Sequence, residues 1–517
     1  MRLGRTVSFW VLSVLFVTIK SNAATFDVRA YGAKGDQKTN DRAAIQRAVG
    51  ACSTAGGGTV YFPPGNYLSG TIRLRSNITL QLDAGATLWA STNQNDYEKG
   101  YSHLILAENV ENVSIIGSGT INGQATADFG RRRDVQEERP SFRTHIMLFQ
   151  NCRRVTIRDV AILYSDSWTI HLKRCENVFI DGVTILNNYY RTNSDGIDPN
   201  SCRNVHISNC HIVAGDDCIV LKSTESYPCE NVVVTNCTLE TIATALKLGT
   251  ESRGDFRNIH FSNCTIRNTP VGIGFYMKDG ATMERVTCSN ISIEATSPTL
   301  HSVYPIFMDI EKRHPDSRIG TIRDVVFRDI QIQSGSGSLI QGMPESPIEN
   351  VTLQNITVRA ERVEDQTKRS KPIGGTRTTR DERDTKYARQ PAYLILAHVK
   401  GLLLDNVRVL PSDDAMLQSP RSAMSGHQLE NGIIRGVYRS PGGDAAKDAP
   451  VVVLSDCREM LLTGCQPAHG TPLFLRLAGK DTSRISLVGN DLRNATRPIV
   501  QNEDVPANAV SDAESKR

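Results

Sequence analysis

The chain has 517 residues, about three times the usual single-domain length, which indicates either several domains or one elongated repeat architecture. With 39% hydrophobic and 22% charged residues it can bury a core, which excludes wholesale disorder, and twelve cysteines are too few for a small disulfide-stapled scaffold. The net charge of +4 falls to +1 without residues 1–23, which hold three of the 59 basic and none of the 55 acidic side chains, so charge gives no argument for nucleic acid or a membrane.

Residues 1–23 are a candidate secretory signal. Arg2 and Arg5 precede an apolar run at 7–19, and small residues follow at 21–24. The run has about 13 residues, short of the roughly 20 that span a bilayer, so we expect cleavage rather than a membrane anchor. The expected localisation is secreted, extracellular or periplasmic, with no membrane span in the mature chain.

The next predicted element is a helix over residues 41–52. Ala44, Ile45, Ala48 and Val49 fall on one of its faces. The repeats that follow would form a stack with open ends, and an open end exposes strands to pairing with other molecules. We therefore expect a short N-terminal capping helix.

An apolar phrase then recurs every 27 residues, with anchors at Val178, Val205, Val232, Ile259 and Val286. Within a unit, apolar residues fall at the anchor and two, five and seven positions later; the steps of two indicate a strand, and the step of three indicates a bend. One coil cannot bury its inward face alone, whereas stacked coils give a continuous core of parallel strands. The sequence predicts an all-β fold, a parallel β-helix.

The 27-residue repeat also indicates the domain organisation. Weaker copies of the phrase occur at 112–115, 154–157, 324–327, 350–353, 402–404 and 484–487. We expect a β-helix catalytic domain at 24–360, a charged insertion or loop at 361–390, further coils at 391–500 and a disordered tail at 501–517.

The cysteines repeat with the same period, so most of them should stack in buried columns as small apolar side chains. Export would permit disulfides. The pair that we expect to be bridged is Cys202 with Cys218.

Two acidic motifs, at 193–196 and 215–218, depart from the ladder. Because turns differ in length, Asp195, Asp216 and Asp217 can lie on one flank of neighbouring coils. Neighbouring carboxylates repel, which a purely structural stack would avoid unless a cation or a reaction required them, although aspartate is also common in turns. Shared charge separates their pKa values and provides an acid and a base at one pH, which suggests glycoside hydrolysis. A separation near 5 Å would favour a retaining mechanism, and about 6.5–9.5 Å an inverting one.

These motifs, together with the phrases at 26–36, 56–65 and 167–171, resemble family 28 of the glycoside hydrolases, the polygalacturonase group in the pectin-lyase-like β-helix superfamily. The resemblance covers roughly residues 25–360. It implies a single-stranded right-handed parallel β-helix and inverting hydrolysis with no metal or other cofactor. It also implies Asp216 as the general acid and Asp195 and Asp217 as the groups that activate water.

The resemblance implies substrate-binding roles for Asn193, Thr244, Lys247, Tyr276 and Lys278. Thr244 stands where typical members carry histidine, and Tyr276 stands where they carry arginine, whereas Lys278 keeps the family's lysine. Lys278 could pair with a substrate carboxylate, and Lys247 could replace part of the lost positive charge. These departures add rhamnogalacturonan or another substituted pectic chain as an alternative to simple polygalacturonate.

The leading hypothesis is a secreted hydrolase that cleaves α-galacturonosyl linkages, acting as a monomer on an acidic polysaccharide of the pectin or galacturonan type. One alternative is a calcium-dependent pectate lyase on the same fold. Another is a non-catalytic carbohydrate-binding β-helix surface protein. The sequence leaves open whether cleavage is internal or from a chain end.

Overall fold

The computed structural model describes residues 24–125, 142–296, 303–360, 387, 390–441 and 449–513. The expected signal at 1–23 and almost all of the expected insertion at 361–390 lie outside these residues. Within the described ranges, no helix is long and apolar enough to cross a membrane.

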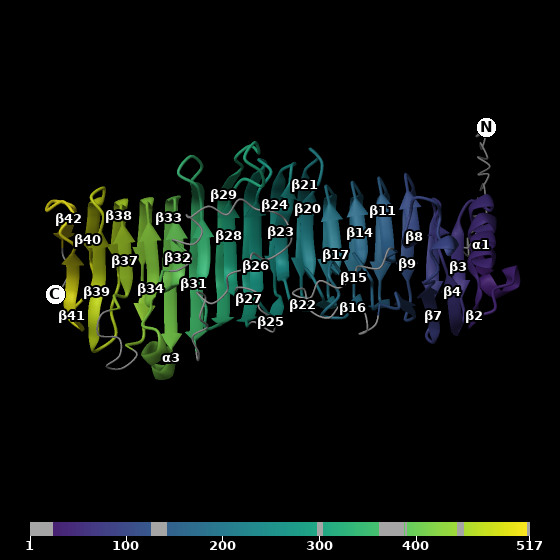
Figure 1. Cartoon of the computed structure of the whole chain (residues 1–517), viewed down its shortest axis with the longest axis horizontal. Helices are drawn as coiled ribbons and strands as arrows, with labels where there is room; N and C mark the ends of the chain where they lie inside the picture. The colour runs from purple at the N-terminus through teal and green to yellow at the C-terminus, as the bar shows by residue number, and fades with distance from the viewer. Residues whose placement is uncertain are drawn as a thin grey trace, which may run out of the picture.

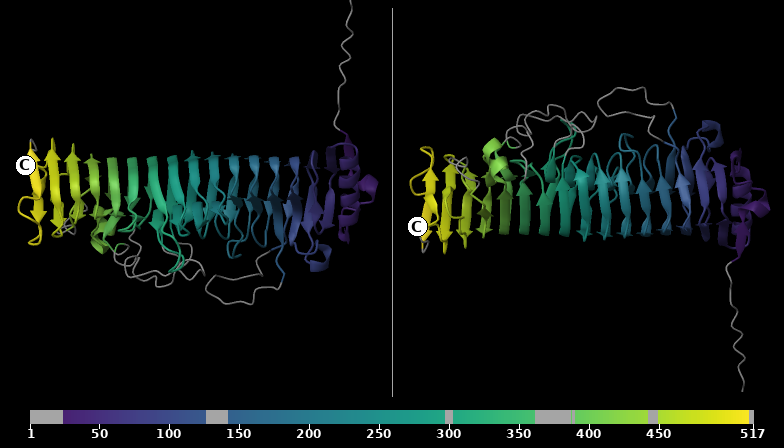
Figure 2. Two further views of the ribbon diagram at one scale, coloured as in Figure 1. Left: turned by 90° about the horizontal axis from the view of Figure 1, so that it is seen from above. Right: turned by 90° about the horizontal axis from the view of Figure 1, so that it is seen from below.

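The described chain winds into one long stack of coils (Figure 1). Helix α1 (Arg42–Thr54) lies at one end of the stack, and strands β41 and β42 lie at the other. Neighbouring coils are joined by parallel strand pairs, and two further views show the strands running across the long axis over its whole length (Figure 2). This arrangement confirms the predicted parallel β-helix.

One flank of the stack is a parallel sheet, called sheet B, with one strand from each coil; it has 15 strands among the described residues. In chain order, these strands are β5 (Ile72–Arg73), β8 (His103–Glu108), β11 (His145–Gln150), β14 (Ile170–Lys173), β17 (Ile197–Asn200), β20 (Ile219–Ser223), β23 (Thr244–Ser252), β26 (Val271–Met277), β28 (Tyr304–Ile310), β30 (Ser338–Gln341), β32 (Ala392–Ala397), β34 (Ser422–His427), β37 (Val452–Ser455), β39 (Thr471–Ala478) and β41 (Ala495–Gln501).

The remaining strands form sheet A, in which most early coils contribute two short strands separated by a bend. The first strands of these pairs are β1 (Thr25–Asp27), β3 (Gly58–Phe62), β6 (Ile78–Leu82), β9 (Glu111–Ile116), β12 (Arg153–Arg158), β15 (Glu176–Asp181), β18 (Arg203–Ser208), β21 (Cys229–Thr235) and β24 (Phe256–Ser262). The second strands are β2 (Asp36–Asn40), β4 (Gly65–Ser69), β7 (Ala86–Ala90), β10 (Thr120–Asn122), β13 (Ala161–Leu163), β16 (Thr184–Leu186), β19 (His211–Ala214), β22 (Thr238–Thr241) and β25 (Thr265–Thr269).

In the later coils the two short strands merge, because β27 pairs with both β24 and β25. The merged strands are β27 (Thr282–Ala295), β29 (Thr321–Gln333), β31 (Ile348–Ala360) and β33 (Val399–Pro411). The last strands of sheet A are β35 (Glu430–Arg435), β36 (Tyr438–Arg439), β38 (Arg458–Thr463), β40 (Ser483–Val488) and β42 (Val510–Ala513). The short helices are η1 (Val28–Tyr31), η2 (Gln94–Asp96) and α3 (Asp413–Gln418).

The 27-residue repeat corresponds to the strand register of sheet A. Val178 pairs with Val205, Val205 with Val232, Val232 with Ile259, and Ile259 with Val286. All five side chains are fully buried. The repeat therefore exists because each coil places the same inward side chain on the one before it, which builds a continuous apolar core.

Asparagines recur at a bend in successive coils and link each coil to the next. Asn177, Asn204, Asn231 and Asn258 have φ between 56° and 59°, a left-handed conformation that asparagine tolerates better than most side chains. The side-chain amides of the last three each donate to the amide oxygen of the preceding asparagine, over 2.8–3.1 Å. The asparagine before four of the five anchors thus serves both the bend and the contact between coils.

Helix α1 confirms the expected cap, with bounds shifted to Arg42–Thr54. Ala44, Ile45, Ala48 and Val49 are all buried against the first coil. The Asp41 carboxylate before the helix accepts hydrogen bonds from the backbone of the preceding turn at 2.7 and 2.9 Å.

Two expectations are wrong. Cys202 and Cys218 are free and buried. Cys202 lies two residues after the end of β17, whereas Cys218 directly precedes β20. They therefore lie at opposite ends of neighbouring strands, beyond the reach of a disulfide. Residues 501–513 are also not a disordered tail, because Val510 of β42 pairs with Ile485 of β40 and so adds a further strand to sheet A.

Candidate active site

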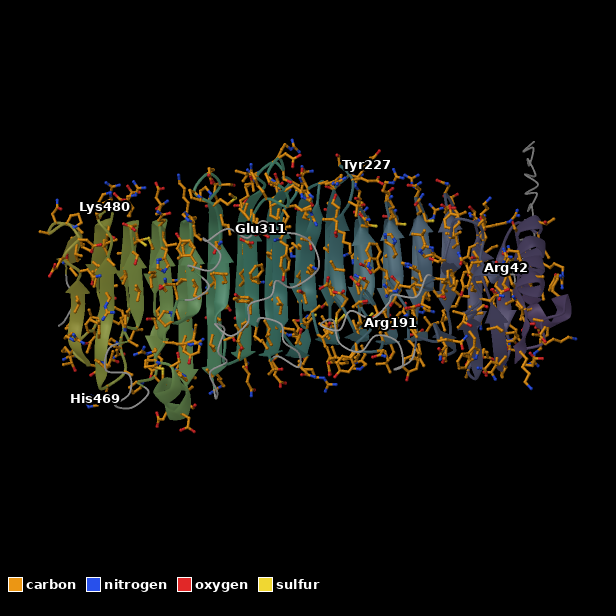
Figure 3. The ribbon with its side chains drawn as sticks, viewed as in Figure 1. Arg42, Arg191, Tyr227, Glu311, His469 and Lys480 are labelled. Atoms are coloured by element: carbon orange, nitrogen blue, oxygen red, sulfur yellow. The ribbon has the colours of Figure 1, made fainter. Side chains whose placement is uncertain are left out.

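The three aspartates that the sequence singles out lie together at the start of two adjacent strands of sheet B. Asp195 precedes β17, and Asp216 and Asp217 precede β20. All three are buried, and one carboxylate oxygen of each lies within 4.8 Å of an oxygen of the other two. The cluster belongs to the middle coils, where Figure 3 labels Arg191 and Glu311, far from both ends of the stack.

The strand register explains this convergence. Ile197 of β17 pairs with Ile219 of β20. Asp195 and Asp217 each stand two residues before this pair, so they occupy equivalent positions although they are 22 residues apart in the chain. The N–H of Gly196 donates to the Asp217 carbonyl at 2.9 Å, which fixes the two turns against each other.

Three of the expected substrate-binding residues contact the aspartates directly. The N–H of Asn193 donates to Oδ2 of Asp216 at 3.1 Å, and the N–H of Thr244 donates to Oδ1 of Asp217 at 3.1 Å. The Lys247 ammonium lies 2.7 Å from Oδ2 of Asp217. Thr244 thus contributes its backbone, and Lys247 is an ion-pair partner of a candidate catalytic group.

Sequence reasoning missed a second lysine beside the cluster. Lys222 on β20 places its Nζ 3.7 Å from Asp195, 3.6 Å from Asp198 and 3.6 Å from Glu251. It also lies 4.9 Å from the centroid of the Trp168 ring, within the range of a cation–π contact. The Lys222 side chain is only 6% exposed, so its charge acts in a poorly solvated environment.

The environment changes how the cluster holds protons. Burial raises the pKa of Asp195 well above its usual value, and the charges of Asp216 and Asp198 raise it further. Burial raises the pKa of Asp198 to about 7, although Lys222 opposes this shift. Burial by itself would lower the pKa of Lys222, but the carboxylates of Asp195, Glu251 and Asp198 outweigh burial and raise it. Burial and mutual repulsion therefore keep a proton in the cluster at pH values where a free aspartate has lost it.

The two remaining expected residues lie on the next coils. Tyr276 is in β26, its ring centroid 5.1 Å from the Lys247 ammonium and 4.9 Å from the Phe307 ring. Lys278 follows β26 and forms an ion pair with Glu311, and both side chains are buried. Glu311 therefore pairs with the positive charge of Lys278, which was expected to pair with a substrate carboxylate.

On the opposite side of the aspartates, Asp166 forms ion pairs with both Arg143 and Arg191. Arg143 also reaches the side-chain oxygen of Asn193 at 3.5 Å. These contacts connect the turn that carries Asn193 to the preceding coil.

Three converging carboxylates could also attract a cation, since calcium prefers oxygen ligands. Here Lys222 and Lys247 supply positive charge at Asp195 and Asp217. We assign no metal to the cluster, and the expectation that the reaction needs none stays a prediction.

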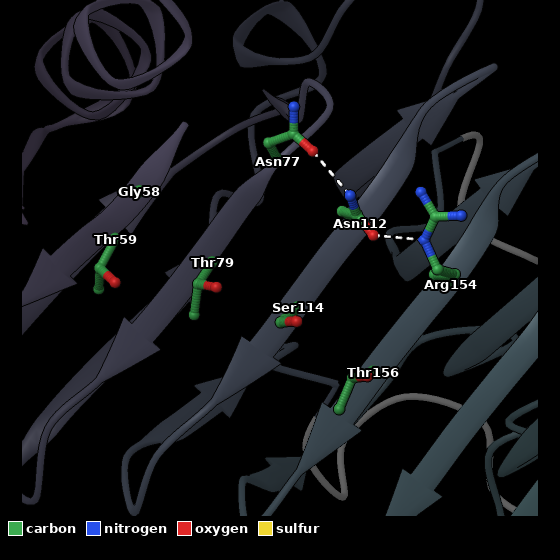
Figure 4. Close-up of a pocket in the computed structure, with 8 residues that line it drawn as sticks. All are labelled: Gly58, Thr59, Asn77, Thr79, Asn112, Ser114, Arg154 and Thr156. Carbon is green, nitrogen blue, oxygen red and sulfur yellow. Dashed lines mark hydrogen bonds between the residues drawn. The ribbon is translucent and has the colours of Figure 1, made fainter. Parts of the chain in front are cut away.

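A shallow groove lies elsewhere, on sheet A between β3, β6, β9 and β12 (Figure 4). Thr59, Thr79, Ser114 and Thr156 line it with hydroxyl groups, and the Asn112 amide donates to Asn77 above them at 2.8 Å. None of its lining residues is acidic. The groove therefore has no acid–base pair comparable to that of the aspartates.

Buried, clustered carboxylates on a parallel β-helix are the kind of site expected of a β-helical glycoside hydrolase. Residues 52–374 match the family model described as glycosyl hydrolases family 28. The chain belongs to this family, and its similarity is to polygalacturonases.

A probable polygalacturonase from Vitis vinifera is 32% identical over 230 residues, which cover 40% of this chain and 46% of that relative. The chain spans about half the length of the curated relatives it matches. The structure of a hyperthermoactive exopolygalacturonase from Thermotoga maritima superposes with a TM-score of 0.57 at 24% identity, over 65% of this chain and 87% of that one. A polygalacturonase from Erwinia carotovora gives 0.53 at 18% identity, over 83% and 99%. These two likenesses concern the fold.

Sequence reasoning missed Lys222, although the apolar residues around it in β20 indicate a buried lysine. All five residues of β20 are buried, and Lys222 is the charged one among them. A lysine in a buried strand needs a carboxylate nearby, because a buried charge is costly unless it is paired. Its partners Asp198 and Glu251 could not be named from the sequence, since they depend on the register of sheet B.

Proposed function

We propose that the protein is a secreted glycoside hydrolase that cleaves α-galacturonosyl linkages of pectic polysaccharide. The observation that carries this proposal is the convergence of Asp195, Asp216 and Asp217 within 4.8 Å on sheet B. Export rests on the signal-like segment at 1–23.

In this proposal Asp216 protonates the glycosidic oxygen, and Asp195 and Asp217 activate the attacking water. Asp216 accepts a hydrogen bond from the N–H of Asn193, and Asp217 forms an ion pair with Lys247. Direct attack by water inverts the anomeric centre, as the family resemblance implies. The nearest oxygens of the three carboxylates lie within 4.8 Å of one another, less than the roughly 6.5–9.5 Å that separates the two carboxyl groups of an inverting enzyme. The two distances differ in kind, because the nearest oxygens of two carboxyl groups lie closer together than the groups themselves. The anomer of the first product therefore has to be measured.

The experiment measures reducing ends released from polygalacturonate, methyl-esterified pectin and rhamnogalacturonan, with and without a chelator. Release that the chelator leaves unchanged, with an inverted first product by proton NMR, is the expected result. An unsaturated product whose absorbance disappears with the chelator would identify a calcium-dependent lyase. Binding to these polymers without any cleavage would identify a carbohydrate-binding protein.

A second candidate substrate is a rhamnogalacturonan or another substituted pectic chain. It is favoured by the buried ion pair between Lys278 and Glu311, because Lys278 already has a carboxylate partner. A sugar without a free carboxylate fits next to such a pair more readily than a uronate, whose charge would meet that of Glu311.

Glu311→Gln is expected to raise activity on polygalacturonate relative to rhamnogalacturonan. The variant removes the negative charge that faces Lys278, and a charge-assisted hydrogen bond of about 1.5–3 kcal/mol corresponds to a change of roughly tenfold or more in the ratio of kcat/KM values. Glu294→Gln, at an exposed position of β27, is the matched control and should leave the ratio unchanged. An unchanged ratio in Glu311→Gln as well would show that Glu311 does not select the substrate.

A further inference from the structure

Lys222 occupies an unusual position in the cleft. Its ammonium lies at nearly the same distance, 3.6–3.7 Å, from carboxylates on two neighbouring coils, Asp195 and Asp198 on one side and Glu251 on the other. Trp168, from a third coil, contributes its ring at 4.9 Å. None of the three carboxylate distances is short enough for a strong hydrogen bond, so Lys222 acts as a shared central charge.

The two outermost contacts of Lys222 are themselves held in place. The Trp168 ring stands edge-on to His171, with centroids 4.8 Å apart. Glu251 lies 4.0 Å from Arg313, which makes a two-pronged ion pair with Asp279 at 2.6 and 2.9 Å. Trp168 and Glu251 are therefore fixed in their positions around Lys222.

Asp216 and Asp217 add negative charge near Asp195 and Asp198, and further charged groups face this position from the neighbouring coils. On β14, burial and then the charge of Lys222 lower the pKa of His171 to about 3, so this ring is neutral, and Lys173 is paired with Glu225. On the β23 side, Lys247 is paired with Asp217. Among the residues that the structure describes, Lys222 is thus the cation that faces both Asp195 and Asp198.

We propose that Lys222 is a positioning residue that orients Asp195 and Asp198 and favours their ionised form, and that it thereby sets the pH range of the reaction. This inference rests on the proposed hydrolase function. Lys222 acts through the aspartates, and no contact of its own with the substrate is needed.

The arrangement predicts opposite effects for two substitutions. Lys222→Met keeps the aliphatic bulk and removes the charge, so Asp195 and Asp198 lose the cation that favours their ionised form. Glu251→Gln removes a negative charge that competes for Lys222, so the same two aspartates ionise more easily. The acidic limb of the kcat/KM profile should move to higher pH in Lys222→Met and to lower pH in Glu251→Gln.

The first measurement is the pH profile of kcat/KM for the full chain and its variants. We expect a shift of about one pH unit upwards in Lys222→Met, which means a tenfold loss on the acidic limb, and a smaller downward shift in Glu251→Gln. Lys173→Met is the matched control, because Lys173 aligns with Asn200, and Asn200 with Lys222, in the strand register, yet Lys173 pairs with Glu225. Its profile should keep the wild-type limbs.

The second measurement does not depend on activity. Asp195 has a pKa raised above its unfolded value, so its contribution to stability is present at low pH and is lost as pH rises through the folded pKa. Lys222 reduces this loss because it stabilises the carboxylate. In Lys222→Met the Tm should therefore fall more steeply than in the wild type between about pH 4 and pH 7.

The two measurements separate the inference from the proposed function. If the wild type cleaves no pectic polymer, the proposed function fails, and the dependence of Tm on pH still tests Lys222. Equal loss of kcat/KM at every pH in Lys222→Met, with a Tm curve parallel to that of the wild type, would overturn the inference. If Lys222→Met does not fold, an unshifted or upward-shifted limb in Glu251→Gln would overturn it.

Discussion

Asp216→Asn should lower kcat by about 10²–10⁴-fold on whichever pectic polymer the wild type cleaves, because the amide cannot donate the proton that the leaving oxygen needs. Asparagine keeps the shape of the side chain and an oxygen that can accept the hydrogen bond from Asn193 N–H. The loss should therefore appear in kcat, measured by release of reducing ends, with little change in KM.

Asp329→Asn is the matched control for this substitution. Asp329 occupies a corner of β29, where its carboxylate accepts from Asn355 at 2.8 Å, and the aligned position in β27 is already an asparagine, Asn290. The control should keep full activity. Equal activity of Asp216→Asn and the wild type would remove Asp216 from the reaction.

Asp216→Asn should also be more stable than the wild type at neutral pH. The charge of Asp216 is one of the causes that raise the pKa of Asp195, so removing it relieves repulsion between buried carboxylates. A higher Tm together with lost activity would indicate that the cluster is kept for chemistry at a cost in stability.

The fold could be predicted because its information is local. Each coil repeats the same inward residues, so the spacing of Val178, Val205 and Val232 contains both the strand period and the register of sheet A. Asp195, Asp216 and Asp217 could be proposed as a group because they depart from this regular background.

The pairing of the lysines could not be predicted in the same way. Glu311 follows Lys278 by 33 residues and Glu251 follows Lys222 by 29, and neither spacing equals the 27-residue period. Turns of unequal length decide these contacts, and their lengths are not encoded in the repeat. The Cys202–Cys218 bridge failed for a related reason, since the sequence alone did not tell which end of a sheet B strand each cysteine would occupy.

Gly196→Ala should destabilise the protein and disable the site together. A Cβ at Gly196 would lie 2.4 Å from the Cys218 carbonyl oxygen and 2.8 Å from Ile212. Both neighbours belong to the packed core of the next coil, so the turn that carries Asp195 would have to move away from β20. We expect a loss of about 1–3 kcal/mol in the free energy of unfolding. A displacement of about 1 Å at Asp195 would lower kcat by roughly 10²-fold.

Gly50→Ala in helix α1 is the control for this prediction. No atom lies within 4 Å of a Cβ added there, and alanine favours the helix, so the variant should gain about 0.5–1 kcal/mol and keep full activity. Urea unfolding and reducing-end release on both variants provide the measurement. Gly196→Ala with wild-type stability and activity would mean that close contact between the two coils does not position Asp195. Loss of stability with unchanged kcat would mean that this contact serves the fold alone.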